Sequence, residues 1–169
     1  MGIFRRTVEP AGSVLFVCLG NICRSPTAEG VFRAGADRLG LSERVRADSA
    51  GIGDWHIGSP PDPRAVKAAK RRGYDLSVIR GRQVSADDFT RFGWILAMDE
   101  STLRALEKMK PADFDGHLGL LLDFSPELGL REVPDPYYGG PEGFDRVLDL
   151  VEPATKGLLA EVRLTISQR

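Results

Sequence analysis

The chain has 169 residues, of which 42% are hydrophobic, and its formal net charge at pH 7 is −1. This length suits a single domain with one substantial core. The balanced charge argues against a basic face for nucleic acid and against a polybasic segment for an anionic membrane. No apolar run approaches the roughly 20 residues of a membrane span.

The first residues of the chain carry Arg5 and Arg6 but no apolar segment of the kind found in export signals. The two cysteines of such a chain indicate a reducing compartment and functional thiols, so we expect a cytoplasmic location. We expect residues 1–12 to form a flexible N-terminal extension and residues 13–169 to form the folded domain.

The first predicted strand leads through a short loop into the first predicted helix. An apolar run at 14–17 indicates a buried strand. Further along, Ser25 is expected to cap the helix and Pro26 to lie in its first turn. Apolar residues on one face carry this helix to about Leu39, and Gly40 is expected to end it.

The rest of the chain alternates between predicted strands and helices. The strands are expected at 45–49, 94–98 and 118–122, and the helices at 65–72, 89–92, about 99–109 and about 142–164. Pro153 is expected to kink or break the last helix. The alternation predicts an α/β fold, a single three-layer domain with a central parallel sheet of about four strands and helices on both faces. Ligands of such sheets bind at the carboxyl ends of the strands.

The loop after the first strand carries a thiol, Cys18, and a guanidinium, Arg24. A strand, a tight loop and a helix aim successive backbone N–H groups and the positive helix end into one concavity, which suits phosphate. The same positive field favours a thiolate at Cys18. Arg24 can make a two-point contact with phosphate oxygens that lysine cannot reproduce.

The other residues of this loop suit the same purpose. Gly20 permits close approach of the backbone, and Asn21, the single asparagine of the chain, tolerates a left-handed backbone. The Ser25 hydroxyl can donate to the thiolate and stabilise it when it leaves. We therefore assign the following residues to phosphate binding: Leu19, Gly20, Asn21, Ile22, Cys23 and Ser25.

Residues 14–26 closely resemble the phosphate-binding loop of the low-molecular-weight protein tyrosine phosphatases, Cys-(X)5-Arg-Ser with Gly-Asn-Ile-Cys inside. The segment 135–138, Asp-Pro-Tyr-Tyr, resembles the acid loop of that family. Segments at 48–51, 58–64 and 98–101 are similar in order and spacing. The resemblance runs from about residue 14 to the C-terminus. It implies a catalytic domain that hydrolyses phosphotyrosine in proteins and small aryl phosphates, without a metal, and releases inorganic phosphate.

The resemblance and the chemistry assign catalytic roles to three residues. Cys18 attacks the phosphorus of a phosphate monoester and forms a cysteinyl-phosphate, while Arg24 clamps the phosphate. Asp135, between two prolines, protonates the departing oxygen and then activates the water of the second step. We expect partial burial to keep this carboxyl protonated.

A second thiol and three aromatic residues are expected to belong to the same site. Cys23 is the predicted redox partner that captures oxidised Cys18 as a disulfide, and the alternative is a small buried hydrophobe. Trp55 is predicted to stack on a substrate ring at the rim of the site, with ordinary packing as the alternative. Tyr137 and Tyr138 are expected to form the opposite wall.

One position departs from the family pattern. Many members carry a histidine that is hydrogen-bonded to the loop asparagine, and this chain has Ile79 at the corresponding place. The network that we expect through Asn21, Ser25 and Ser49 therefore lacks one outer member.

Two other functions use a similar loop. A thiol-dependent arsenate reductase generally needs further cysteines downstream, and none follows Cys23 here. A non-catalytic phosphate-binding or phosphopeptide-binding module needs neither the Cys18 thiol nor Asp135. The two histidines and two cysteines are poorly spaced for zinc, and no nucleotide-binding motif is present. We therefore expect no metal, no cofactor, no nucleic acid and no membrane partner; the oligomeric state stays open.

Overall fold

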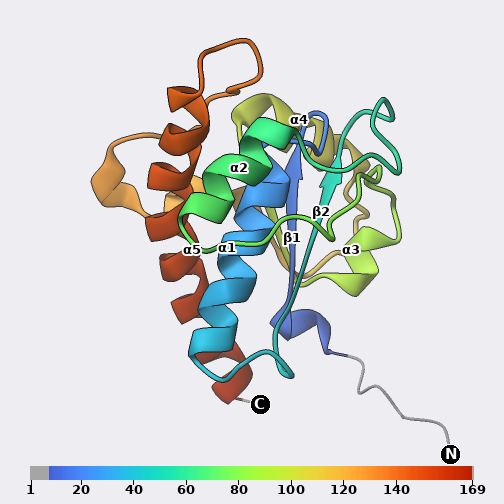
Figure 1. Cartoon of the computed structure of the whole chain (residues 1–169). Coiled ribbons are helices and arrows are strands. Elements are labelled where there is room, and N and C mark those ends of the chain that lie inside the picture. The colour runs from blue at the N-terminus through green and yellow to red at the C-terminus, as the bar shows by residue number, and fades with distance from the viewer. Residues whose placement is uncertain (1–7, 169) are drawn as a thin grey trace, which may run out of the picture.

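The computed structural model of the chain describes residues 8–168. Four parallel strands form one sheet in the order β2-β1-β3-β4, and helices cover both of its faces (Figure 1). The strands are β1 (Ser13–Cys18), β2 (Arg46–Gly51), β3 (Trp94–Ala97) and β4 (His117–Leu120). The predicted three-layer α/β fold with a four-stranded parallel sheet is confirmed.

Five α-helices accompany the sheet in the described residues. They are α1 (Arg24–Arg38), α2 (Pro63–Arg71), α3 (Asp88–Arg91), α4 (Glu100–Met109) and α5 (Glu142–Ser167). Short 3-10 helices lie at Pro10–Gly12, Leu121–Phe124 and Pro126–Leu128. Within residues 8–168, none of the helices is both long and apolar enough to span a bilayer.

The central strand β1 buries side chains on both faces of the sheet. Phe16 points to the side of α1 and α5, where its ring packs against Phe32 with 5.6 Å between the ring centroids. Leu15 and Val17 point to the other side, into a second apolar cluster with residues of α3 and α4. This alternation is that of a parallel strand covered by helices on both faces. Because β1 is fixed from both sides, Cys18 at its carboxyl end is held firmly.

Two local expectations were wrong, and the break expected at Pro153 is absent. The N-cap of α1 is Cys23, and Ser25 lies inside the first turn because its hydroxyl bonds within the loop. Strand β4 ends at Leu120, since the chain turns there into the 3-10 helix. Helix α5 passes Pro153 without a break, as buried residues on both sides of the proline hold it to the core.

The segment just before β1 packs against the domain. The Gly93 N–H donates to the Pro10 carbonyl over 2.8 Å, and the Trp94 indole N–H donates to the Ala11 carbonyl over 3.0 Å. Residues 10–12, which we expected in a flexible extension, are therefore tied to the start of β3. Residues 1–7 of the expected extension lie outside the described residues.

The packing of α5 yields a stability prediction. Leu158 is fully buried in the core between α5 and the sheet, whereas Leu164 on the same helix is 56% exposed. Leu158→Ala should lower the free energy of unfolding in urea by about 2–5 kcal/mol, because it leaves a cavity. The matched variant Leu164→Ala should change it by less than about 0.5 kcal/mol. Equal losses in the two variants would show that α5 does not pack as described.

Candidate active site

The loop between β1 and α1 surrounds the sulfur of Cys18 with hydrogen-bond donors. Cys18 is almost fully buried, and its Sγ lies 3.0 Å from the Ser25 Oγ. The backbone N–H of Asn21 donates to the same sulfur over 3.3 Å. Donors aimed at a sulfur stabilise its negative charge, both before attack and when it departs.

Asn21 sets the direction of the Ser25 hydroxyl. Its Nδ2 donates to the Ser25 Oγ over 2.9 Å, so the hydroxyl acts as an acceptor there and must direct its own proton elsewhere. The Cys18 sulfur at 3.0 Å is closer than the Ala50 carbonyl at 3.5 Å. The Oδ1 of Asn21 accepts the Arg82 N–H over 3.0 Å, which fixes the amide at both ends.

The end of β2 holds the loop backbone in place. The N–H groups of Ile52 and Gly53 donate to the carbonyls of Cys18 and Leu19 over 3.0 and 2.9 Å. Gly51 allows this approach, because a Cβ there would lie 3.1 Å from the Leu19 carbonyl oxygen. On the other side of the loop, the Ile22 carbonyl accepts the Asp62 N–H.

Arg24 is buried and held by two oxygens. Its Nη1 donates to the Asp99 Oδ2 over 2.6 Å and to the Val133 carbonyl over 3.0 Å. Asp99 also caps α4, since its Oδ1 accepts the Thr102 N–H over 2.8 Å. Burial alone would raise the pKa of Asp99, but these hydrogen bonds outweigh it and lower that pKa. The carboxylate that orients Arg24 therefore stays charged.

The sulfur and the guanidinium line a cleft of about 320 Å³. The residues predicted for its rim, Trp55, Tyr137 and Tyr138, line it as well, and so does Asp135. Trp55 is 65% exposed, and the rings of Tyr137 and Tyr138 meet edge to face with centroids 4.9 Å apart. Sequence reasoning did not include His56, a further lining residue. The cleft thus joins a polar base to aromatic walls.

Asp135 enters the cleft from a proline-bounded loop. Its Oδ2 lies 3.8 Å from the Arg24 Nη2, and its Oδ1 accepts the Tyr137 N–H over 3.1 Å. The side chain is 45% exposed, so Asp135 is partly buried in the lining of the cleft. This position suits proton transfer at the rim.

Cys23 lines the same cleft as Cys18, and both are free thiols. Burial, with a further contribution from the Asp62 carboxylate, raises the pKa of Cys23 to about 12. Cys23 is therefore a neutral thiol over the physiological pH range.

Ser49 and Ile79 lie farther from the sulfur. The Ser49 hydroxyl donates to the Glu29 carboxylate over 2.7 Å rather than to Asn21 or Ser25. Ile79 is buried in a small apolar cluster, and the Asn21 Oδ1 is occupied by the Arg82 N–H.

Sequence reasoning missed the roles of Arg82 and Asp99. The Arg82 side chain bridges Asp48 and Asp88 over 3.0 Å each, which anchors the backbone N–H that holds Asn21. Asp99 was predicted at the start of the helix at about 99–109, without its contact to Arg24. Its place at the carboxyl end of β3, beside β1, was the available signal for a contact with the loop.

Arg24 supplies a positive charge to the lining of the cleft. Among residues 8–168, no group of three or more histidine, cysteine or acidic side chains is arranged to hold a metal ion.

Comparison with known proteins agrees with this geometry. Residues 13–168 match the family of low molecular weight phosphotyrosine protein phosphatases. The chain belongs to this family. A relative from Bacillus subtilis, the low molecular weight protein-tyrosine-phosphatase YfkJ, is 44% identical over 151 residues, which cover 89% of the chain and 96% of the relative. The human low molecular weight phosphotyrosine protein phosphatase is 44% identical over 137 residues, 80% of the chain and 85% of the relative.

A solved structure shares the fold as well. The protein tyrosine phosphatase from Entamoeba histolytica superposes with a TM-score of 0.85 at 40% identity, covering 89% of the chain and 96% of that structure. The predicted family membership is confirmed.

Glu29 is a buried carboxyl of this phosphatase fold, on α1 beneath the loop. Only 2% of it is exposed, and it lies 2.9 Å from the Arg33 guanidinium. Burial raises its pKa from 4.5 to about 7, and this effect outweighs Arg33 and the Ser49 hydrogen bond, which both lower it. Between these two values the folded state binds the proton more strongly than the unfolded state, so folding stability falls as the pH rises.

Glu29→Gln should remove this pH dependence. The free energy of unfolding of the variant minus that of the wild type should increase by up to about 3 kcal/mol between about pH 4.5 and pH 8. Urea unfolding at several pH values measures the difference. The control Glu161→Gln, an exposed position on α5, should give a constant difference. A constant difference for Glu29→Gln would contradict the raised pKa.

Proposed function

We propose that the chain hydrolyses phosphotyrosine in proteins, and small aryl phosphates, through a cysteinyl-phosphate at Cys18. The observation that carries the proposal is the hydrogen-bonded sulfur: Ser25 Oγ lies at 3.0 Å and the Asn21 N–H at 3.3 Å, at the base of a cleft shared with Arg24. A buried sulfur surrounded by donors is suited to attack phosphorus and to leave again.

In the first step the Cys18 thiolate attacks the phosphorus. The sulfur–phosphorus bond forms as the bond from phosphorus to the phenolic oxygen breaks, and Asp135 gives its proton to that oxygen. In the second step the Asp135 carboxylate takes a proton from water, and the water oxygen attacks phosphorus. The sulfur–phosphorus bond then breaks, and the Ser25 hydroxyl and the Asn21 N–H receive the thiolate.

Arg24 orients the phosphate and balances its charge. Since Nη1 is occupied by Asp99 and Val133, the edge formed by Nε and Nη2 is the one that faces the anion. A planar guanidinium makes two parallel contacts with phosphate oxygens, and loop N–H groups supply the others. The anion is thereby held in line with the sulfur, which lowers the entropic part of the barrier.

The aromatic rim selects the substrate. Trp55 on one side and Tyr137 with Tyr138 on the other are suited to hold a phenyl ring between them. A phosphotyrosine side chain is long enough to place its phosphorus beside the buried Cys18, whereas phosphoserine is shorter. The proposal includes residues 13–169 as the catalytic domain and a reducing, cytoplasmic setting, because Cys18 acts only as a free thiol.

Kinetics on matched peptides test this function. Without added metal, kcat/KM should be at least about a hundredfold higher for a phosphotyrosine peptide than for its phosphoserine counterpart, because only the former reaches the sulfur with its phosphorus. Cys18→Ser should abolish turnover while inorganic phosphate still binds. Equal kcat/KM for the two peptides, or arsenate reduction with a thiol in place of hydrolysis, would contradict the proposal.

The acid role of Asp135 depends on the leaving group. Asp135→Asn should lower kcat/KM by about 10²–10⁴-fold for phenols that leave poorly, since these need the proton. The loss should be much smaller for an activated ester such as p-nitrophenyl phosphate. A series of substituted phenyl phosphates measures the slope of rate against leaving-group pKa. A uniform loss across the series would make Asp135 structural.

The proposed redox role of Cys23 follows from its place in the cleft. Mild peroxide should convert Cys18 to a sulfenic acid. The Cys23 thiol then condenses with this sulfenic acid, and the products are a disulfide and water. Peptide mass spectrometry should detect the disulfide, and dithiothreitol should restore activity. In Cys23→Ser, most of the activity should be lost irreversibly. Full recovery of this variant would show that Cys23 does not protect Cys18.

A further inference from the structure

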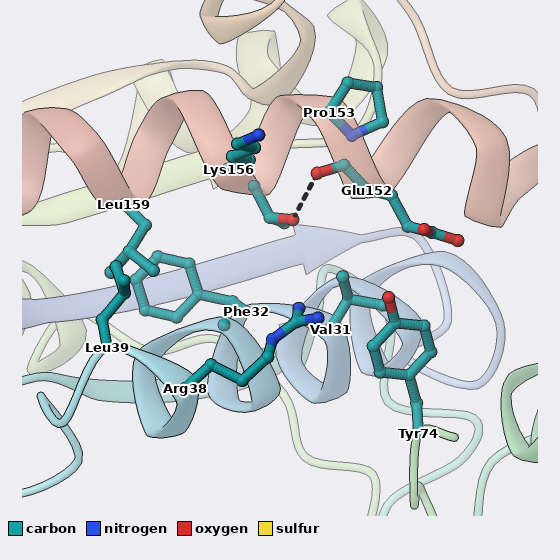
Figure 2. Close-up of a pocket in the computed structure, with 11 residues that line it drawn as sticks. Val31, Phe32, Arg38, Leu39, Tyr74, Glu152, Pro153, Lys156 and Leu159 are labelled. Atoms are coloured by element: carbon teal, nitrogen blue, oxygen red, sulfur yellow. Dashed lines mark hydrogen bonds between the residues drawn. The ribbon is translucent and has the colours of Figure 1, made fainter. Parts of the chain in front are cut away.

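A second cavity, of about 460 Å³, lies in the groove between α1 and α5 (Figure 2). It shares no lining residue with the active-site cleft. Its volume is within the range of small-molecule sites, roughly 300–1,000 Å³. The groove therefore offers room for a ligand that the proposed hydrolysis does not use.

The floor of the groove is apolar. Phe32 and Leu159 are buried there, and Leu39, 48% exposed, stands at one end. Gly35 keeps the two helices close, because a Cβ at this position would lie 3.3 Å from the Leu159 Cδ2. The apolar part of a ligand in this groove would remove its own surface and the exposed surface of Leu39 from water, which favours binding.

Cationic side chains stand over this floor. Arg38 comes from the end of α1 and Lys156 from α5, and neither forms an ion pair within residues 8–168. In Figure 2 the guanidinium of Arg38 lies near Val31 and Tyr74. The lining contains one acidic residue, Glu152, whose carboxylate is paired with Arg72 over 2.6 Å. The remaining charge of the groove is therefore positive.

Tyr74 adds a hydrogen-bond donor to the same end of the groove. Its hydroxyl points toward α5 (Figure 2), and burial together with the Glu152 carboxylate raises the pKa of Tyr74. The hydroxyl consequently stays protonated, so Tyr74 adds no negative charge that would repel an anion.

We propose that the groove between α1 and α5 binds a small amphipathic organic carboxylate. Its aromatic or branched aliphatic body lies on the floor formed by Phe32, Leu39 and Leu159. Its carboxylate lies against Arg38 and Lys156. Apolar pockets with a few convergent polar groups select amphipathic ligands. The charged group of the ligand fixes its orientation, and its apolar part supplies the buried area.

Titration with 2-naphthoate tests the site. Inorganic phosphate is kept at saturating concentration, so that the carboxylate cannot enter the active-site loop. The expected result is saturable binding by calorimetry, with amide NMR shifts concentrated at Gly35, Leu39 and Lys156. The neutral analogue 2-naphthalenemethanol should bind about tenfold more weakly, because it lacks the charge-assisted contacts.

Charge-removing variants locate the site. Arg38→Gln and Lys156→Gln should each weaken 2-naphthoate binding by about tenfold without lowering the melting temperature. The matched controls Arg163→Gln and Lys67→Gln remove the same charges at exposed positions outside the groove and should leave binding unchanged. No saturable binding, equal binding of the neutral analogue, or equal losses in the control variants would overturn the proposal.

Discussion

The turn between β1 and α1 places Cys18, the Asn21 N–H and the Ser25 hydroxyl around one point, and this turn depends on the backbone of Asn21. Asn21 is the non-glycine residue with positive φ in the described part of the chain, at 60°. Such a conformation costs an ordinary residue about 1–2 kcal/mol, and asparagine tolerates it best. Bonds from its amide to Ser25 and Arg82 hold the turn. The sulfur environment is thus built into the fold.

The electrostatics of the cleft require a buried cation with fixed counter-charges. Arg24 is 4% exposed, and a guanidinium so deeply buried needs partners. Asp99, between the end of β3 and the start of α4, supplies a charged carboxylate, while Asp135 comes from a separate loop. One carboxylate therefore orients the Arg24 guanidinium, and the other lies at the rim, where we propose that it transfers a proton. This division of roles explains why two acidic residues approach the same guanidinium.

Local sequence patterns predicted most of the strands and helices and the loop after β1. Contacts between residues far apart in the chain were not predicted. The strand, loop and helix around residues 14–38 follow from an apolar run and a dense motif, so the loop was predicted residue by residue. Asp99 reaches the loop from the end of β3, and Arg82 from a loop segment that pairs with the end of β2, so local spacing in the sequence does not reveal these contacts. The Ser25 cap was wrong because its hydroxyl bonds the Cys18 sulfur instead. Helix α5 passes Pro153 because core packing outweighs the local preference.

The proposed mechanism depends on Cys18 carrying the phosphate during turnover. The most direct test mixes the wild-type protein with excess p-nitrophenyl phosphate, stops the reaction within milliseconds in acid and locates the phosphate by peptide mass spectrometry. We expect a phosphorylated Cys18, formed together with a burst of nitrophenol that approaches one equivalent of protein when the second step is slow. Turnover with an unmodified Cys18 at every time point, or with phosphate on another residue, would contradict it.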